Sequence, residues 1–342
     1  MRARVLSAAL AASLALGCGD KSGPEVVATE FAEPLAGALN QTFFYLNYVD
    51  EQAGTGIRDY ACGVKTYNGH AGTDITLANF AVMDSGVPVL AAAPGTVVET
   101  HDGEFDRQKR WITGAVPNYV VLRHPDGVQS RYLHLKHNSI AVNVGQQVQA
   151  SDVLGYVGSS GFSDIPHLHF EVHDADDALI DPWVGACGAQ QSRWSVQRSY
   201  QDAFSLYGSG LTDADLTLDL VKDPPAQVTS FTVADPKVTM WVELMNAPAG
   251  TVTEFRLYRP DGALFFTASD TLPQFYSLSW WWGWHAIPGY LTPGVWRMQY
   301  RNDGVPLAER AFVVVDTGPL PSPNLQRMRA GRGGGGVGKP PF

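Results

Sequence analysis

Positive charge is scarce in this sequence, and so are long apolar runs with helical periodicity. The 24 lysines and arginines are outnumbered by 34 aspartates and glutamates, which gives a formal net charge of −10 at pH 7. A nucleic-acid-binding protein needs a basic patch, so the composition argues against nucleic acid as a partner. The 35 glycines and 22 prolines instead favour a mostly β protein with frequent turns. A hydrophobic fraction of 45% leaves ample material for a core.

The length of 342 residues suits two domains rather than one. Short β-like runs separated by turn signals occur in two series, before and after a break near Pro224-Pro225. The last residues are rich in glycine, proline and arginine, which predicts disorder. The predicted divisions are a targeting segment (1–17), a tether (18–40), a first β domain (41–200), a linker (201–225), a small Ig-like β-sandwich (226–316) and a disordered tail (317–342).

The N-terminus has the pattern of an export signal. Arg2 and Arg4 precede the apolar stretch Val5–Leu16, which is too short to span a bilayer. The stretch ends in Ala15-Leu16-Gly17-Cys18, which resembles the lipobox of bacterial lipoproteins, with alanine and leucine in the reverse of the usual order. The resemblance implies an exported protein, periplasmic or at the cell surface, that is anchored to a membrane through a lipid on Cys18. The alternative is an ordinary secretory signal with an incidental cysteine.

Only three cysteines are present, and two remain if Cys18 carries a lipid. Export places Cys62 and Cys187 in an oxidising compartment, where an even pair suggests a disulfide. Such a bridge would join the two ends of the histidine-rich region. The alternative is a pair of buried free thiols.

The histidines are concentrated in one part of the chain, with eight of the nine between His70 and His173. His167 and His169 lie in an apolar stretch that predicts a strand, on which residues i and i+2 point to the same face. Two imidazoles on one face suit a shared metal ion or a reacting water. A surface strand with two solvated histidines is the alternative.

Two further segments carry residues suited to the same chemistry. Gly69 and Gly72 disfavour a helix around His70 and Asp74, so we predict an extended segment on which both side chains share a face. Together with one histidine of the His-x-His strand they provide two nitrogens and one oxygen, a set typical of catalytic zinc. Taken alone, this segment would favour a polar turn. His134 lies in another apolar strand, where a core or surface histidine is the usual interpretation.

The motifs together resemble the M23 (lysostaphin-type) zinc metallopeptidases, over residues 60–175. The resemblance implies that His70, Asp74 and His169 bind Zn²⁺. It also implies that His134 and His167 stay uncoordinated and act on the attacking water and the tetrahedral intermediate. The pattern departs from the family before Pro166, where Asp164-Ile165 replaces the usual Thr-Gly. The motifs that carry the resemblance, in chain order, are His70-x-Gly72-x-Asp74, Tyr132-x-His134-Leu135, Gly158-x-x-Gly161 and His167-Leu168-His169-Phe170-Glu171.

The resemblance implies a zinc endopeptidase that cleaves peptide bonds in the stem peptides or cross-bridges of bacterial peptidoglycan. One rival is a catalytically silent M23-like protein that binds the wall or activates a separate cell-wall amidase. Such proteins usually lack one or more metal ligands, whereas all five expected residues are present here. Another rival is an adhesion or binding protein with a vestigial peptidase.

Other polar and aromatic residues receive separate predictions. Asn118 is predicted to line the cleft, and the polar stretch 101–117 to form a loop at its rim. The aromatic run from Trp280 to Trp284 is either an exposed platform for a partner or sugar, or a set of residues that alternate between the sandwich core and the first domain. The histidines expected to have structural, surface or supporting roles are His101, His124, His137, His173 and His285.

Overall fold

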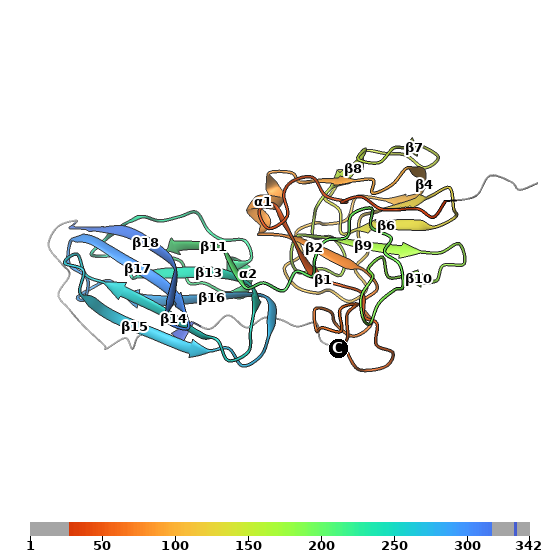
Figure 1. Ribbon diagram of the computed structural model, residues 1–342. Coiled ribbons are helices and arrows are strands. Elements are labelled where there is room, and N and C mark those ends of the chain that lie inside the picture. The colour runs from red at the N-terminus through yellow and green to blue at the C-terminus, as the bar shows by residue number, and fades with distance from the viewer. Residues whose placement is uncertain (1–26, 317–331, 334–342) are drawn as a thin grey trace, which may run out of the picture.

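The structure is a computed structural model that describes residues 27–316 and 332–333 and confirms a mostly β fold. Two β units lie side by side (Figure 1). We call them the N-terminal unit, which ends before β11, and the C-terminal unit, which begins with β11. The predicted signal segment, Cys18 and most of the predicted tail lie outside the described residues. Within the described part of the chain, no helix is long and apolar enough to cross a membrane.

The N-terminal unit is built on one antiparallel sheet with the strand order β1-β2-β9-β6-β5-β4-β7, and β10 also pairs with β9. A separate pair, β3 and β8, and a short helix, α1, complete the unit. The sheet strands are β1 (Phe43–Asn47), β2 (Thr73–Leu77), β4 (Gly95–His101), β5 (Tyr119–Arg123), β6 (Gln129–Leu133), β7 (Gln147–Val148), β9 (His167–His173) and β10 (Leu179–Ile180). The others are β3 (Pro88–Leu90), β8 (Val153–Tyr156) and α1 (Phe80–Asp84).

Strand β9 lies between β2 and β6, and its two faces differ as the sequence predicts. Leu168, Phe170 and Val172 are fully buried in the hydrophobic core of the unit. Because side chains alternate along a strand, His167 and His169 therefore point to the opposite face. Pairing of β9 with β2 places His169 opposite Asp74. The position of β9 in the sheet thus brings the two predicted metal-binding segments together.

Part of the predicted tether belongs to the core of the N-terminal unit. Phe31 and Leu35 are 0% and 2% exposed, and the backbone of Phe31 bonds to that of Arg193 and Ser195. The prediction of a tether over residues 18–40 is therefore wrong for this portion. The two apolar side chains pack into a core built from distant segments, and the polar composition around them does not indicate this contact.

The predicted disulfide between Cys62 and Cys187 is confirmed, with a Cα–Cα distance of 5.2 Å. The bridge links residues 125 positions apart. It joins the loop that precedes the His70 segment to the loop that follows β10. In the unfolded chain this cross-link restricts a long loop, which favours the folded unit.

The C-terminal unit has two sheets, with the strand orders β11-β13-β16-β19 and β12-β18-β17-β14-β15. Their inner faces enclose a second hydrophobic core. The strands are β11 (Ser205–Thr212), β12 (Ser230–Thr232), β13 (Lys237–Ala247), β14 (Val252–Tyr258), β15 (Leu264–Thr271), β16 (Tyr276–Ala286), β17 (Gly294–Asn302), β18 (Val305–Val315) and β19 (Arg332–Gly333). A short helix, α2 (Leu218–Val221), follows β11.

The segment predicted as a linker, residues 201–225, contains a structural strand. Strand β11 pairs along its length with β13, so the C-terminal unit begins about 20 residues earlier than predicted. The glycines at 208 and 210 obscure the strand in the sequence, because glycine is depleted in strands. Here the absence of a side chain is needed, since a Cβ on Gly208 would lie 1.9 Å from Glu243 Oε2.

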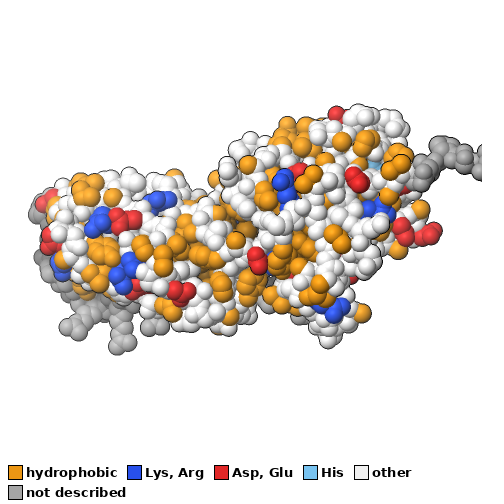
Figure 2. Space-filling model, in the orientation of Figure 1, with side chains coloured by type: hydrophobic (Ala, Val, Ile, Leu, Met, Phe, Trp, Pro, Cys, Tyr) orange, Lys and Arg blue, Asp and Glu red, His pale blue; other side chains and the backbone are white. Residues whose placement is uncertain are grey.

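The tryptophan run alternates between the core of the C-terminal unit and the N-terminal unit. Trp281 belongs to the sandwich core, whereas Trp280 belongs to a separate apolar cluster that spans both units. Both are buried, at 6% and 4% exposure. We call this second group the junction cluster; its buried members are Phe44, Leu46, Ile165, Val221, Trp241, Met245, Leu278 and Trp280. On the face drawn in Figure 2, apolar side chains continue across the boundary between the units.

Glu243 is a fully buried carboxyl group beside the junction cluster. Its oxygens accept hydrogen bonds from Trp280 Nε1 at 3.2 Å and from Asn79 Nδ2 of the N-terminal unit at 3.5 Å. Burial raises the pKa of Glu243 from about 4.5 to about 8, because these two neutral donors only partly replace water around the charged form.

This carboxyl group gives a prediction about stability and pH. Between pH 4.5 and 8 the folded chain retains a proton on Glu243 that the unfolded chain releases, so the group lowers stability as pH rises. The loss is about 1.4 kcal/mol per pH unit for one proton. We expect Glu243→Gln to gain stability relative to wild type between pH 5 and pH 8, as measured by urea unfolding. A difference that stays constant over this range would contradict the prediction.

Candidate metal centre

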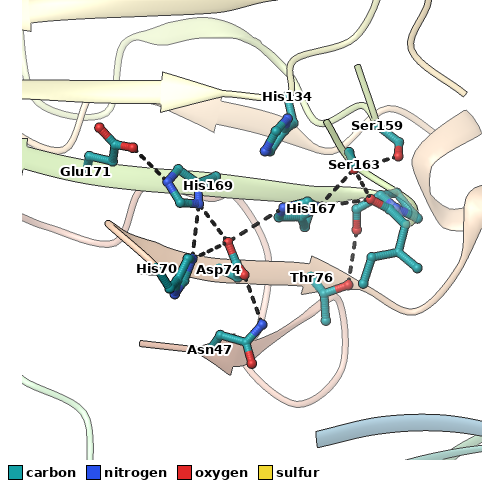
Figure 3. Close-up of polar contacts among 12 residues, drawn as sticks. Asn47, His70, Asp74, Thr76, His134, Ser159, Ser163, His167, His169 and Glu171 are labelled. Atoms are coloured by element: carbon teal, nitrogen blue, oxygen red, sulfur yellow. Dashed lines mark hydrogen bonds and ion pairs between the residues drawn. The ribbon is translucent and has the colours of Figure 1, made fainter. Parts of the chain in front are cut away.

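Three donor atoms converge where β2 and β9 meet the segment that precedes β2 (Figure 3). Asp74 Oδ1 lies 3.1 Å from His70 Nε2 and 2.8 Å from His169 Nδ1, and these two nitrogens are 3.2 Å apart. All three residues are buried. In a tetrahedral zinc site with bonds of about 2.0–2.1 Å, neighbouring donor atoms lie about 3.3 Å apart. The spacing of the three atoms therefore fits one small cation.

The hydrogen bonds of the two histidines leave the converging nitrogens free to bind a metal. His70 Nδ1 lies 2.6 Å from the carbonyl oxygen of Tyr48 and must donate to it, so Nε2 carries the lone pair. His169 Nε2 lies 2.9 Å from Glu171 Oε1 and donates to that carboxylate, so in the neutral ring Nδ1 carries the lone pair. Two lone pairs and a carboxylate oxygen directed at one point repel one another unless a proton or a metal cation lies among them. The donor set thus fits zinc.

Electrostatics at the site favour positive charge. Although burial opposes ionisation, the neighbouring His70, His167 and His169 lower the pKa of Asp74 well below its usual range. Burial also lowers the pKa of His169, but Asp74 and Glu171 outweigh this effect and raise it to about 10. The negative potential that holds a proton on His169 would equally favour a metal cation, which displaces that proton on binding.

Neighbouring side chains orient the donors. Asn47 Nδ2 donates to Asp74 Oδ2 at 2.9 Å, which leaves Oδ1 directed at the two histidines. Glu171 joins His169 to His173, whose Nε2 lies 2.8 Å from Glu171 Oε2. Such outer partners fix the rotamer and tautomer of a ligand and support its affinity for metal.

The structure explains why a glycine, Gly72, stands midway between His70 and Asp74. A Cβ at this position would lie 2.7 Å from His169 Nε2 and 2.8 Å from the carbonyl oxygen of Phe170. A side chain would therefore displace the ring of His169 or separate β2 from β9. The His-x-Gly-x-Asp spacing is thus a packing requirement of the metal centre.

His134 and His167 lie beside the donor set, with their ring centroids 4.5 Å apart. His134 Nδ1 donates to the carbonyl of Ser160 at 2.7 Å, and His167 Nδ1 donates to that of Ile165 at 2.9 Å. Both rings therefore keep a lone pair on Nε2. Burial lowers the pKa of each ring, and for His134 the nearby His167 and His169 add to the effect. Both rings are neutral near pH 7 and can accept a proton.

The backbone of His134 is unusual, with a φ of 65°, in the left-handed region. A non-glycine residue in this region costs free energy and is held by its surroundings. Here the backbone bonds of the adjoining residues, from Leu135 N to Asn118 O and from Gly158 N to His134 O, hold the turn. The turn aims the imidazole toward the donors instead of continuing the line of β6 (Figure 3).

A cleft of about 460 Å³ opens from the metal centre, and Asp74, His134 and His167 lie along it. Trp111 and Phe162, whose rings are 5.4 Å apart, form part of one wall. The loop predicted at residues 101–117 thus reaches the cleft through Trp111. Gln274–Leu278 and Trp280 of the C-terminal unit also line the cleft.

The sequence departure at Asp164-Ile165 has a structural counterpart at the junction. Ile165 is a buried member of the junction cluster, and Asp164 forms an ion pair with Lys222, which is 3% exposed. The carbonyl that accepts the bond from His167 belongs to Ile165. The contact with the C-terminal unit therefore reaches the backbone group that sets the tautomer of His167.

One prediction about the cleft needs correction, and two residues with a role near the site were not predicted from the sequence. Asn118 does not line the cleft: it is fully buried and its Nδ2 donates to the carbonyls of Glu104 and Leu135. Lys222 had no signal beyond its charge, because its role depends on a contact between segments. Glu171 stands in the motif that contains His169, and its position two residues further along the same strand is the signal that could have assigned it a role beside that ring. Three histidines predicted to be structural or peripheral lie away from the donor set: His101 pairs with Glu104, His124 bonds to Pro94 and Ser130, and His285 is buried in the C-terminal unit.

A buried His-Asp-His donor set, open to a cleft and flanked by two further histidines, is typical of the zinc-dependent hydrolases. Residues 68–182 match the family model of Peptidase family M23, and this part of the chain is an M23 peptidase domain.

Known proteins share this domain. Glycyl-glycine endopeptidase ALE-1 of Staphylococcus capitis is 32% identical over 137 residues, which are 40% of this chain and 32% of that protein. Peptidoglycan DD-endopeptidase ShyA of Vibrio cholerae is 34% identical over 103 residues, which are 30% of this chain and 20% of that protein. The catalytic domain of lysostaphin from Staphylococcus simulans is 26% identical, with a TM-score of 0.28, over 42% of this chain and 90% of that chain. The matched segment thus spans about a third or less of the two relatives.

Proposed function

We propose that the protein is a zinc-dependent endopeptidase that hydrolyses peptide bonds in bacterial peptidoglycan. The observation that carries the proposal is the convergence of His70 Nε2, Asp74 Oδ1 and His169 Nδ1 at the head of a cleft. These three atoms would hold the metal. When bound, zinc would supply a Lewis acid that makes water a nucleophile near neutral pH and polarises the scissile carbonyl.

The two remaining histidines would handle the proton. Each holds its Nδ1 proton on a backbone carbonyl and keeps Nε2 free, so the pair can take the proton of the attacking water and return it to the leaving amine. His167 Nε2 is 3.6 Å from Asp74 Oδ1, which places it next to the donor set. Burial of both rings favours the neutral form, which is the form that accepts a proton.

The proposed substrate is supported by the relatives, whose names describe a glycyl-glycine endopeptidase and a peptidoglycan endopeptidase. The export pattern at the N-terminus agrees with a substrate outside the cytoplasm. We propose that the chain is exported and attached to a membrane through a lipid on Cys18, with peptidoglycan as its partner.

The proposal is tested with the soluble form that begins at Gly19. We expect cross-linked peptidoglycan fragments to be cut at one type of peptide bond, as read by mass spectrometry. A chelator should stop cleavage, and one equivalent of Zn²⁺, but not Mg²⁺, should restore it because the donor set suits zinc. A protein that binds stoichiometric zinc and cuts no fragment would overturn the endopeptidase and favour a silent wall-binding protein or an amidase activator.

A further inference from the structure

The cleft at the metal centre does not end at the N-terminal unit. Asp74, His134 and His167 line it at one end, and residues of the turn between β15 and β16 line it elsewhere. In this turn Gln274 is exposed and Phe275 is half-buried, so both present surface to a ligand. The C-terminal unit therefore shares a cavity with the candidate catalytic residues.

The turn is firmly attached to the N-terminal unit. It leads into β16, whose Leu278 and Trp280 are buried in the junction cluster together with Ile165. Lys222 adds a polar connection, because its ammonium group pairs with Asp164 and donates to the carbonyl of Lys109 at 3.1 Å. Buried apolar contacts and a partly buried ion pair together fix the position of the turn relative to the histidines.

The residues that line the cleft are uncharged except near the metal centre and the junction between the two units. Among the described residues that line it, none is lysine or arginine, and the acidic ones are Asp74 and Asp164. Asp74 belongs to the donor set, and Asp164 is paired with Lys222. The rest of the lining supplies amide groups, hydroxyl groups and aromatic rings, including Gln274 and Phe275.

We infer that the C-terminal unit forms one wall of the substrate-binding cleft and that this wall receives an uncharged peptide segment on one side of the scissile bond. Gln274 can bond to peptide groups, and Phe275 offers an apolar face to side chains. A segment that carries free carboxylates would meet no cation along this wall and would lose hydration without compensation. The inference rests on the proposed function for its substrate class, and it makes Gln274 and Phe275 specificity-determining residues.

The test uses two synthetic cross-linked peptidoglycan peptides that differ only in whether their side-chain carboxyl groups are free or amidated. Binding to the chelator-treated soluble form is followed by tryptophan fluorescence, since Trp111 and Trp280 line the cleft. Without metal, binding is measured apart from hydrolysis. We expect the amidated peptide to bind about tenfold more tightly, and Phe275→Ala to weaken its binding about tenfold.

Two further variants separate recognition from damage to the fold. Leu264→Ala, at an exposed residue of β15 that does not line the cleft, should bind as wild type. Gln274→Lys should shift preference toward the peptide with free carboxylates, a gain that unfolding cannot produce. Equal binding of both peptides, no detectable binding, or unchanged binding by Phe275→Ala and Gln274→Lys would overturn the inference. If these preferences appear but the zinc-loaded protein cuts neither peptide, the wall assignment stands and the proposed hydrolysis fails.

Discussion

His169→Ala is expected to remove zinc binding and hydrolysis together. The substitution deletes one of three donors and leaves Asp74 Oδ1 and His70 Nε2, 3.1 Å apart, with an open side. It also leaves Glu171 without the ring to which it bonds at 2.9 Å. We expect zinc to be lost on dialysis and kcat/KM on peptidoglycan fragments to fall by at least about a thousandfold. Metal content by mass spectrometry and initial rates provide the two readouts.

A second histidine provides the matched control for this experiment. His101 is partly exposed, pairs with Glu104 and lies away from the donor set, so His101→Ala should retain both zinc and activity. Retention of stoichiometric zinc by His169→Ala would show that the donor set is wrong. Loss of zinc with activity unchanged would show instead that hydrolysis does not need the metal.

The fold is predictable from the sequence where local pattern determines it. Alternation in β9 correctly places His167 and His169 opposite the buried Leu168 and Phe170, because the period of two is a local property of a strand. Strand β11 escapes prediction because Gly208 leaves room for Glu243 and Gly210 leaves room for Trp241, both of which lie far along the chain. The burial of Phe31 depends likewise on a distant core.

The candidate site, like the fold, is predictable from the sequence only where a local pattern determines it. The spacing of His70 and Asp74 predicts that their side chains share a face, and the structure places both beside His169. Nothing local predicts that Ile165 would be buried against another unit while its carbonyl binds His167. The wall formed by Gln274 and Phe275 is equally hidden, since a sequence shows which residues are available for a cleft but not which distant turn packs beside it.

His134→Ala and His167→Ala are expected to keep zinc but to lose catalysis. Neither ring belongs to the donor set, and each is held by a backbone carbonyl. Removal of a general acid or base typically costs about 10²- to 10⁴-fold in rate, and the loss should appear in kcat because the rings act on the reacting groups. Zinc stoichiometry and peptide binding should stay close to those of wild type.

The double variant tests whether the two rings work as a pair. With their centroids 4.5 Å apart and their Nε2 lone pairs both free, His134 and His167 can share the proton of one reaction. Residues that act as a unit give non-additive losses, so the double variant should be scarcely slower than the slower single variant. Losses that multiply would assign the rings to independent steps. A single variant as active as wild type would remove that histidine from the mechanism, and the remaining ring would then have to carry the proton alone.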